Sequence, residues 1–182
     1  YIFVLSAEFS LALDYNLTQY DLAKYLGKYY RLQIIESGVE QSVWIGSNRS
    51  GLIVLNLKEI KSVLVGQKFN NNFYPILKVS DREFLAGSYE DGIFRINDNS
   101  FKIFRITKYP GAIYRYSKDE VLICDGYGDI YLLNLKTDEI KLFRFKEKLK
   151  RSSIQSIFKD NQNIFWIATL NGIIKINEEG TP

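Results

Sequence analysis

Residues 164–177 read IFWIATLNGIIKIN, and the outline of this stretch recurs four more times along the chain. It contains a short apolar run, a small residue, a polar turn and a second apolar run that closes on asparagine. Short runs rich in Ile, Leu, Val, Phe and Tyr are typical of strands in a buried sheet. A tight hairpin turn favours Gly, Asn or Asp because a residue in it adopts positive φ. The stretch therefore predicts a two-stranded antiparallel hairpin.

The five hairpin segments recur with a spacing of 35 to 43 residues between the ends of their turns. In each, an Asn or Asp lies five residues beyond the turn, where its side chain can end the strand in an Asx turn. The segments are residues 9–21, 43–57, 84–97, 121–135 and 164–177; the turns end on Asn16, Gly51, Gly92, Asp129 and Gly172; and the closing residues are Asp21, Asn56, Asn97, Asn134 and Asn177.

Further apolar runs flank the hairpins, such as residues 112–117 before one of them and residues 101–106 after another. One unit is then four antiparallel strands in about 40 residues, the size of a propeller blade. The sequence predicts an all-β fold, a β-propeller segment spanning residues 1–182 with about four and a half to five blades. The approximate blade boundaries are 1–30, 31–69, 70–109, 110–150 and 151–182.

Because propellers usually close with four to eight blades, three arrangements are open. The chain is part of a larger ring, or it closes as five blades with residues 1–5 supplying a missing edge strand, or two chains complete each other. The absence of Met favours a piece of a longer protein and hence a partial propeller.

Composition excludes several kinds of site. With no His, the Ser-His-Asp and Cys-His nucleophile systems and the common zinc sites are absent, and one Cys cannot form an internal disulfide. We predict no catalytic residue, no metal ligand and no cofactor. The net charge of +3 is mixed along the chain, and residues 144–151, the densest basic stretch, fit a solvated connector rather than a nucleic-acid site. No apolar run approaches the roughly 18 residues of a membrane span, so we expect no membrane contact by this segment.

The last unit, residues 152–177, resembles a two-component regulator propeller repeat. That pattern has an apolar strand, Asp, a polar turn, Trp-Ile-Gly-Thr, a short turn, Gly-Leu and a closing Asp or Asn. The last unit departs from it in having Ala168 for Gly and Ile173 for Leu. The matching residues are Ile157, Asp160, Trp166, Ile167, Thr169, Gly172 and Asn177 in the last unit, Trp44, Ile45, Gly46, Ser47, Gly51, Leu52 and Asn56 in the second, and Ala86, Gly87, Ser88, Gly92, Ile93 and Asn97 in the third.

The resemblance implies a function that composition does not. Proteins with such repeats are typically the extracytoplasmic sensor regions of hybrid histidine kinases in Bacteroides-type bacteria, and many respond to carbohydrates. We therefore expect a periplasmic, non-enzymatic sensor segment whose ligand is an oligosaccharide. The parent protein would be a dimeric histidine kinase, and the partner of this segment would be the remainder of the same propeller or a second copy of the chain.

A ligand is expected at the end of the propeller where the turns between second and third strands meet the connectors to the next blade. Aromatic faces stack on sugar rings, while amides, carboxylates and Arg bond hydroxyl groups. Gly, Asn and Asp are also what tight turns require, so Tyr89, Tyr127 and Arg49 are the stronger candidates. The candidate ligand-binding residues are Asn48, Arg49, Tyr89, Glu90, Asp91, Tyr127, Asp129 and Asn171.

Two other functions remain open. The first is a protein-interaction propeller without a small ligand. The second is a propeller glycosidase or lyase, in which the pairs Glu90/Asp91 or Asp125/Asp129 would supply the two carboxylates that glycoside hydrolysis needs. The equivalent residues Trp44 and Trp166 are predicted to pack between blades, and Cys124 is predicted to be a buried small residue rather than a nucleophile.

Overall fold

The computed structural model describes residues 2–4, 8–13, 16–21, 32–37, 43–47, 52–55, 60–63, 69, 72–97, 100–145 and 152–177. Within these residues the secondary structure consists of β-strands, and no helix occurs among them. The all-β prediction is confirmed. Each sheet is built from strands that are consecutive in the chain, and each strand pairs antiparallel with the next strand of the same sheet.

Five antiparallel sheets result, and we call each one a blade. Three blades have four strands, and the first and fifth have three within the described residues. The blades are β1 (Ile2–Val4), β2 (Glu8–Leu13) and β3 (Asn16–Asp21); β4 (Leu32–Ser37), β5 (Val43–Ser47), β6 (Leu52–Leu55) and β7 (Ile60–Val63); β8 (Phe73–Ser80), β9 (Glu83–Ser88), β10 (Gly92–Asn97) and β11 (Phe101–Phe104); β12 (Pro110–Arg115), β13 (Glu120–Asp125), β14 (Ile130–Asn134) and β15 (Ile140–Phe143); and β16 (Ile154–Lys159), β17 (Ile164–Thr169) and β18 (Gly172–Asn177).

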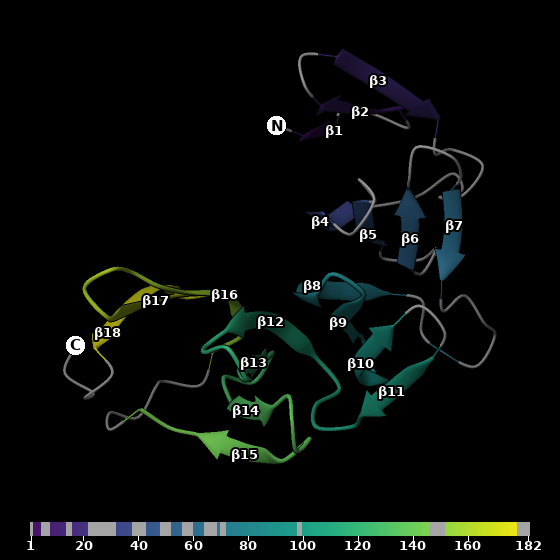
Figure 1. Ribbon diagram of the computed structural model, residues 1–182. Coiled ribbons are helices and arrows are strands. Elements are labelled where there is room, and N and C mark those ends of the chain that lie inside the picture. The colour runs from purple at the N-terminus through teal and green to yellow at the C-terminus, as the bar shows by residue number, and fades with distance from the viewer. Residues whose placement is uncertain are drawn as a thin grey trace.

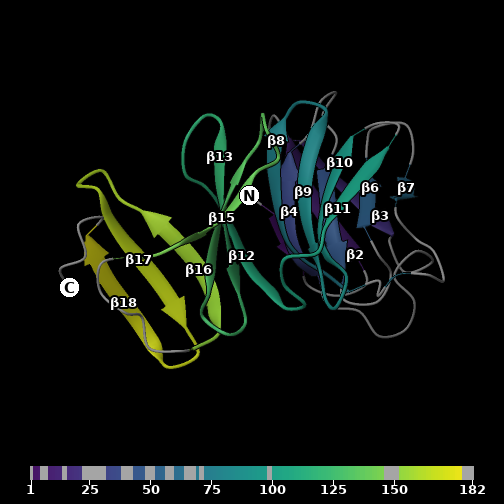
Figure 2. The same cartoon turned by 90° about the horizontal axis from the view of Figure 1, so that it is seen from below.

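The blades follow one another around an arc, as in part of a propeller (Figure 1). The first strands of successive blades contact each other, β4 with β8, β8 with β12 and β12 with β16, so these strands line the inside of the arc. Figure 2 shows the fifth blade beside the fourth at one end. Ile2 pairs with Leu11 of β2, so the chain's first strand is the edge of the first blade. The alternative in which residues 1–5 complete the last blade is wrong.

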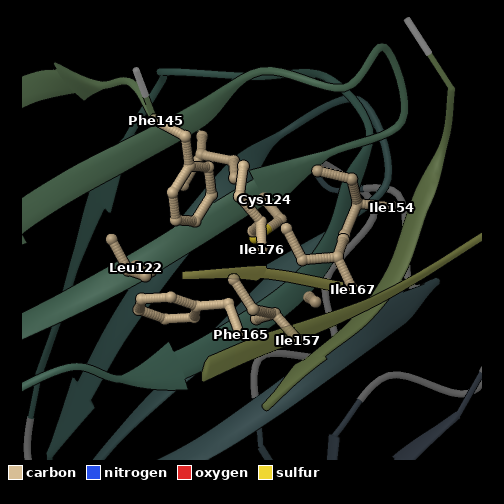
Figure 3. Packing of buried hydrophobic residues seen from close by; sticks show 10 residues of the cluster. Leu122, Cys124, Phe145, Ile154, Ile157, Phe165, Ile167 and Ile176 are labelled. Carbon is tan, nitrogen blue, oxygen red and sulfur yellow. The ribbon is translucent and has the colours of Figure 1, made fainter. Parts of the chain in front are cut away.

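Apolar side chains of neighbouring blades interleave to form the core. Leu85 and Ile93 of the third blade pack against Val121 and Ile123 of the fourth. The opposite face of the fourth blade then packs against the fifth, and Figure 3 shows Phe165 of the fifth blade beside Leu122 of the fourth. Strands buried on both faces read as continuous apolar runs, which is why the sequence shows short runs of Ile, Leu and Phe rather than strict alternation.

A small residue in the second strand of the second, third and fourth blades lies where the inner strand of the following blade approaches. A β-carbon added at Gly46 would lie 2.9 Å from the carbonyl oxygen of Phe73 in β8, and one at Gly87 would lie 2.8 Å from the β-carbon of Pro110 in β12. Cys124 takes the same position in the fourth blade and is fully buried. Burial raises the pKa of its thiol, so the residue is the inert core group that the sequence predicts.

The hairpin turns follow the predicted chemistry with one correction. Gly92 and Gly172 have φ of +106° and +121°, as expected for residues that end tight turns. In the fourth blade the prediction of Asp129 is wrong, because Gly128 takes the positive φ, +92°. Asp129 instead extends toward β14, and its carbonyl accepts from the Asp125 amide at 2.9 Å. Glycine reaches positive φ without a side-chain clash, so the turn is built on it.

Two of the predicted strand-closing residues, Asn97 and Asn134, accept the side-chain hydrogen bonds expected of them. The Asn97 side-chain oxygen accepts a hydrogen bond from the Ser100 amide at 2.9 Å. The Asn134 side-chain oxygen accepts from the Lys136 and Thr137 amides at 2.9 and 3.1 Å. These bonds satisfy backbone donors where the ladder stops, which explains the regular placement of Asn five residues after the turn.

Candidate functional site

Turns and connectors from neighbouring blades meet at the same end of the blades. The Glu90 amide, in the β9–β10 turn, donates to the Lys108 carbonyl in the β11–β12 connector at 2.6 Å. The Gly126 amide, in the β13–β14 turn, donates to the Tyr109 carbonyl of the same connector at 2.7 Å. The expectation that these segments share an end is therefore confirmed in the third and fourth blades.

Three tyrosines form a cluster at this end. Tyr89 comes from the β9–β10 turn, Tyr109 from the connector before β12, and Tyr127 from the β13–β14 turn. The ring centroids of Tyr89 and Tyr109 are 4.8 Å apart and those of Tyr109 and Tyr127 are 5.2 Å apart, both edge to face. Tyr89 and Tyr127 remain 43% and 56% exposed, so the cluster presents aromatic surface to solvent across two blades.

The phenol groups of Tyr89 and Tyr127 are uncharged near neutral pH. Partial desolvation raises the pKa of Tyr89, and the nearby Tyr109 raises it further. Desolvation and the Tyr109 side chain raise the pKa of Tyr127 in the same way. A neutral phenol hydroxyl both donates and accepts hydrogen bonds, so these rings can combine stacking with recognition of polar groups.

The buried carboxylate of Asp125 holds the outer tyrosine in place. Its Oδ1 accepts hydrogen bonds from the amides of Tyr127 at 2.8 Å and Asp129 at 2.9 Å. Its Oδ2 accepts from the Thr107 hydroxyl at 3.4 Å, which ties the turn to the adjacent connector. Asp125 thus organises the backbone beneath Tyr127.

Three predicted acidic residues lie in the same turns as the tyrosines. Glu90 is exposed and adopts a positive φ of 72° beside Tyr89. The next residue, Asp91, accepts a hydrogen bond from the Ser88 hydroxyl at 3.0 Å. Asp129 follows Tyr127 and is partly exposed. The turns that carry Tyr89 and Tyr127 therefore also carry carboxylate groups.

The remaining predicted residues fall elsewhere. Asn171 lies in the corresponding β17–β18 turn of the fifth blade, where its amide donates to the Thr169 hydroxyl at 3.1 Å. Asn48 and Arg49 lie outside the described residues. Tyr109, which joins the other two rings, was not among the predicted site residues. The usable signal was its position in a connector that reaches the same end of the blades.

No group of three or more acidic, His or Cys side chains suited to a metal ion occurs in the described part of the chain. Nor does any helix of membrane-spanning length and hydropathy occur in the ranges given above.

Residues 148–171 match the family model described as the two component regulator propeller. This segment is similar to a two-component regulator propeller repeat. A search of curated proteins found no significant match.

The structure explains two residues of this two-component regulator propeller repeat. Asp160 ends β16 and accepts hydrogen bonds from the amides of Gln162 and Ile164 at 2.9 and 3.0 Å, which closes the turn into β17. Its other oxygen accepts from the Trp166 indole nitrogen at 2.8 Å. The spacing of Asp and Trp in the repeat therefore couples the turn to the orientation of an aromatic side chain.

Solved structures similar to this repeat-bearing chain include the extracellular domains of two hybrid two-component system proteins of B. thetaiotaomicron. BT4673 is 18% identical with a TM-score of 0.67, covering 82% of this chain and 20% of its own. BT3049 is 15% identical with a TM-score of 0.70, covering 97% and 27% respectively. A streptogramin B lyase is also similar, at 15% identity and a TM-score of 0.68, covering 96% and 60%.

At these identities the structural likeness establishes the propeller fold alone. The chain spans about a fifth to a quarter of the length of the two extracellular domains. The sheet geometry and the comparisons together show a partial propeller in which residues 148–171 match the two component regulator propeller model.

Proposed function

We propose that this chain is the ligand-recognition segment of a periplasmic sensor region in a hybrid two-component signalling protein, and that it binds carbohydrate. The observation that carries the proposal is the tyrosine cluster of Tyr89, Tyr109 and Tyr127, exposed where two blades meet. The two-component regulator propeller repeat at residues 148–171 supports the signalling context, as does the extracellular origin of the similar B. thetaiotaomicron structures.

The chemistry of the cluster suits a sugar. The C–H faces of a pyranose ring pack on an exposed aromatic face, and its hydroxyl groups need nearby donors and acceptors. The phenol hydroxyls of Tyr89 and Tyr127 supply both, and the carboxylates of Glu90 and Asp129 supply acceptors. An oligosaccharide is long enough to contact the turns of both blades, which are linked by the ring of Tyr109.

We propose that the segment recognises its ligand without chemical change. Two carboxylates at a set separation are needed for glycoside hydrolysis, one of them accessible as an acid. In this site Asp125 is buried and its Oδ1 accepts two backbone N–H groups, which favours a structural carboxylate. The similarity to streptogramin B lyase concerns the fold and supplies no catalytic group.

A protein-interaction surface is the second candidate, since exposed tyrosines are also enriched at protein interfaces. Binding of the whole chain to an array of plant and host oligosaccharides, followed by calorimetry on the best glycan, separates the two. We expect Tyr89→Ala and Tyr127→Ala each to weaken binding at least tenfold, through lost stacking. Leu142→Ala is the matched control, because Leu142 on β15 is as exposed as Tyr89, at 43%.

Absence of binding to every glycan, or full affinity in the Tyr89→Ala/Tyr127→Ala variant, would contradict the carbohydrate proposal. Tight binding to a protein ligand, lost in the same variants, would favour the interaction scaffold. For the intact protein we propose a membrane span, a histidine kinase domain and a dimeric state, which its full reading frame and light scattering would test.

A further inference from the structure

One face of the fifth blade exposes large apolar side chains. Phe158, Trp166 and Ile173 are 56%, 39% and 73% exposed, on β16, β17 and β18 respectively. Phe158 pairs with Trp166, and Ile173 pairs with Ala168 two residues along the same strand as Trp166. Residues two apart in a strand share a face, so the four side chains form one surface, here called the outer apolar face.

The opposite face of the same blade is already used. Phe165, Ile167 and Ile176 are buried in the cluster shared with the fourth blade (Figure 3). The outer apolar face therefore points away from the fourth blade, toward the end of the arc (Figure 1).

Equivalent positions in the preceding blades are buried against the blade that follows. Trp166 corresponds to Leu85 by strand register, and Ile173, which follows a turn glycine, corresponds to Ile93. Leu85 and Ile93 are both fully buried, in the cluster shared with the fourth blade. In the fourth blade the corresponding residues Leu122 and Ile130 are buried against the fifth. The same set of positions makes each of these two interfaces.

The small residue in the second strand of a blade indicates what covers this face. The carbonyl of Phe73 in β8 lies where a β-carbon of Gly46 would be, and Pro110 in β12 lies where a β-carbon of Gly87 would be. Both are inner strands of the following blade. Ala168 holds the same position in the fifth blade, so it marks where a further inner strand would pass.

A charged residue also occupies equivalent positions in the third and fifth blades. Lys175 pairs with Trp166, as Arg95 pairs with Leu85. Arg95 reaches into the following blade, where its Nη1 donates to the Asp138 carboxylate at 2.6 Å and the Leu135 carbonyl at 2.8 Å. Lys175 is exposed and its Nζ lies 5.3 Å from the centre of the Trp166 ring. On the outer apolar face, Lys175 therefore takes the position from which Arg95 of the third blade donates to the fourth blade.

We propose that a further propeller blade of the intact protein covers the outer apolar face. Its second and third strands would place apolar residues against Trp166 and Ile173, as Val121 and Leu133 lie against the third blade. Its turn between third and fourth strands would present a carboxylate to Lys175, as Asp138 does to Arg95. Continuity with two interfaces of the same pattern favours a blade over any other occupant.

Cysteine labelling in the intact protein tests the proposal. Ile173→Cys reports on the outer apolar face, and Leu170→Cys is the matched control because Leu170 is equally exposed, at 74%. Leu170 corresponds to Tyr89, since the amide of each donates to the residue preceding its blade's inner strand, Ser153 or Asn72. Because Tyr89 remains exposed within the arc, the control position stays accessible when a blade is added.

We expect maleimide to label Ile173→Cys at least tenfold more slowly than Leu170→Cys in the intact protein, and at the same rate in the 182-residue chain. Cys124 is buried and stays unlabelled in both. Ala168→Cys, which copies the residue of the fourth blade, is a milder variant should Ile173→Cys fail to fold. Equal labelling of face and control in the intact protein would overturn the proposal. So would protection in the 182-residue chain together with a doubled mass by light scattering, because a second copy would then be the occupant.

Discussion

At the scale of single residues, the second strand of each blade sets the distance to the next. Gly87 has the carbonyl oxygen of Tyr74 at 2.7 Å and the β-carbon of Pro110 at 2.8 Å from the position that a β-carbon would occupy. Contacts shorter than 3 Å are closer than carbon and oxygen atoms tolerate. Tyr74 belongs to β8 of the same blade, whereas Pro110 begins β12, the inner strand of the fourth blade. The spacing of the third and fourth blades therefore depends on the absence of one carbon atom.

The change Gly87→Ala should lower the free energy of unfolding by about 1–3 kcal/mol, the usual cost of overpacking a core. Urea unfolding of the 182-residue chain measures the effect. Ala168→Cys is the control, since it adds one atom at the equivalent position of the fifth blade and should change stability by less than about 0.5 kcal/mol. Equal stability of Gly87→Ala and the parent chain would show that the blades separate without cost.

Single residues were predictable from the sequence where one side chain determines the local backbone conformation. Asn97 and Asn134 close their strands because an Asx side chain bonds the next amides, whatever the rest of the fold does. It failed for Asp129, because Gly128 was available one position earlier for the positive φ. Tyr109 was missed because its partners, Tyr89 and Tyr127, belong to other turns, and periodicity along one strand carries no information about such contacts.

At the scale of elements, β10 is fastened to the turn between β14 and β15. Arg95 on β10 donates from Nη1 to Asp138 at 2.6 Å, and Lys102 on β11 donates to the other Asp138 oxygen at 2.7 Å. The hydrogen bond from Lys102, followed by the charge of Arg95, holds the pKa of Asp138 below its ordinary value of 3.8. Hydrogen bonds to a charged group are stronger than neutral ones, so this link adds to the apolar contacts between blades.

The Asp138 link should make stability depend on acidity. A carboxyl with a lowered folded pKa contributes stability above pH 3.8, and the contribution is lost as pH falls through the folded pKa. At pH 7 we expect Asp138→Asn to be less stable than the parent chain by about 1 kcal/mol, since the site is partly screened by solvent. The difference should shrink as pH falls below 3.8 and through the folded pKa of Asp138, and it should vanish once Asp138 is protonated in the folded state.

Urea unfolding at several pH values measures that difference. Glu139→Gln serves as control, because Glu139 is well exposed and its pair with Lys141 should contribute little at any pH. A difference between Asp138→Asn and the parent that stays constant with pH would mean that the contact does not depend on the charge of Asp138. The link itself was not predictable from sequence, because a repeat of about 40 residues predicts equivalent strands and says nothing of which charged residues meet across blades.

At the scale of the whole molecule, each blade is held by the apolar faces of its neighbours. The repeat and its strand-forming runs were enough to predict this architecture, because four short strands cannot bury both faces alone and must stack. Phe165 shows how the stacking works for the fifth blade. Its ring is fully buried and lies 5.1 Å from the ring of Phe145, which follows the outer strand of the fourth blade. The fourth and fifth blades therefore share one core.

Removing the Phe165 ring should loosen the fifth blade more than the rest of the arc. Phe165→Ala opens a cavity in the shared core and should reduce stability by about 3–5 kcal/mol. Because nearest-neighbour contacts dominate in repeat folds, hydrogen exchange should rise first in β16, β17 and β18, while β9 and β10 keep their protection. Phe158→Ala, on the exposed side of the same blade, should change both measurements little in the 182-residue chain. An equal rise in exchange across the third, fourth and fifth blades would instead mean that the arc unfolds as a single cooperative unit, and that the apolar faces transmit the loss from blade to blade.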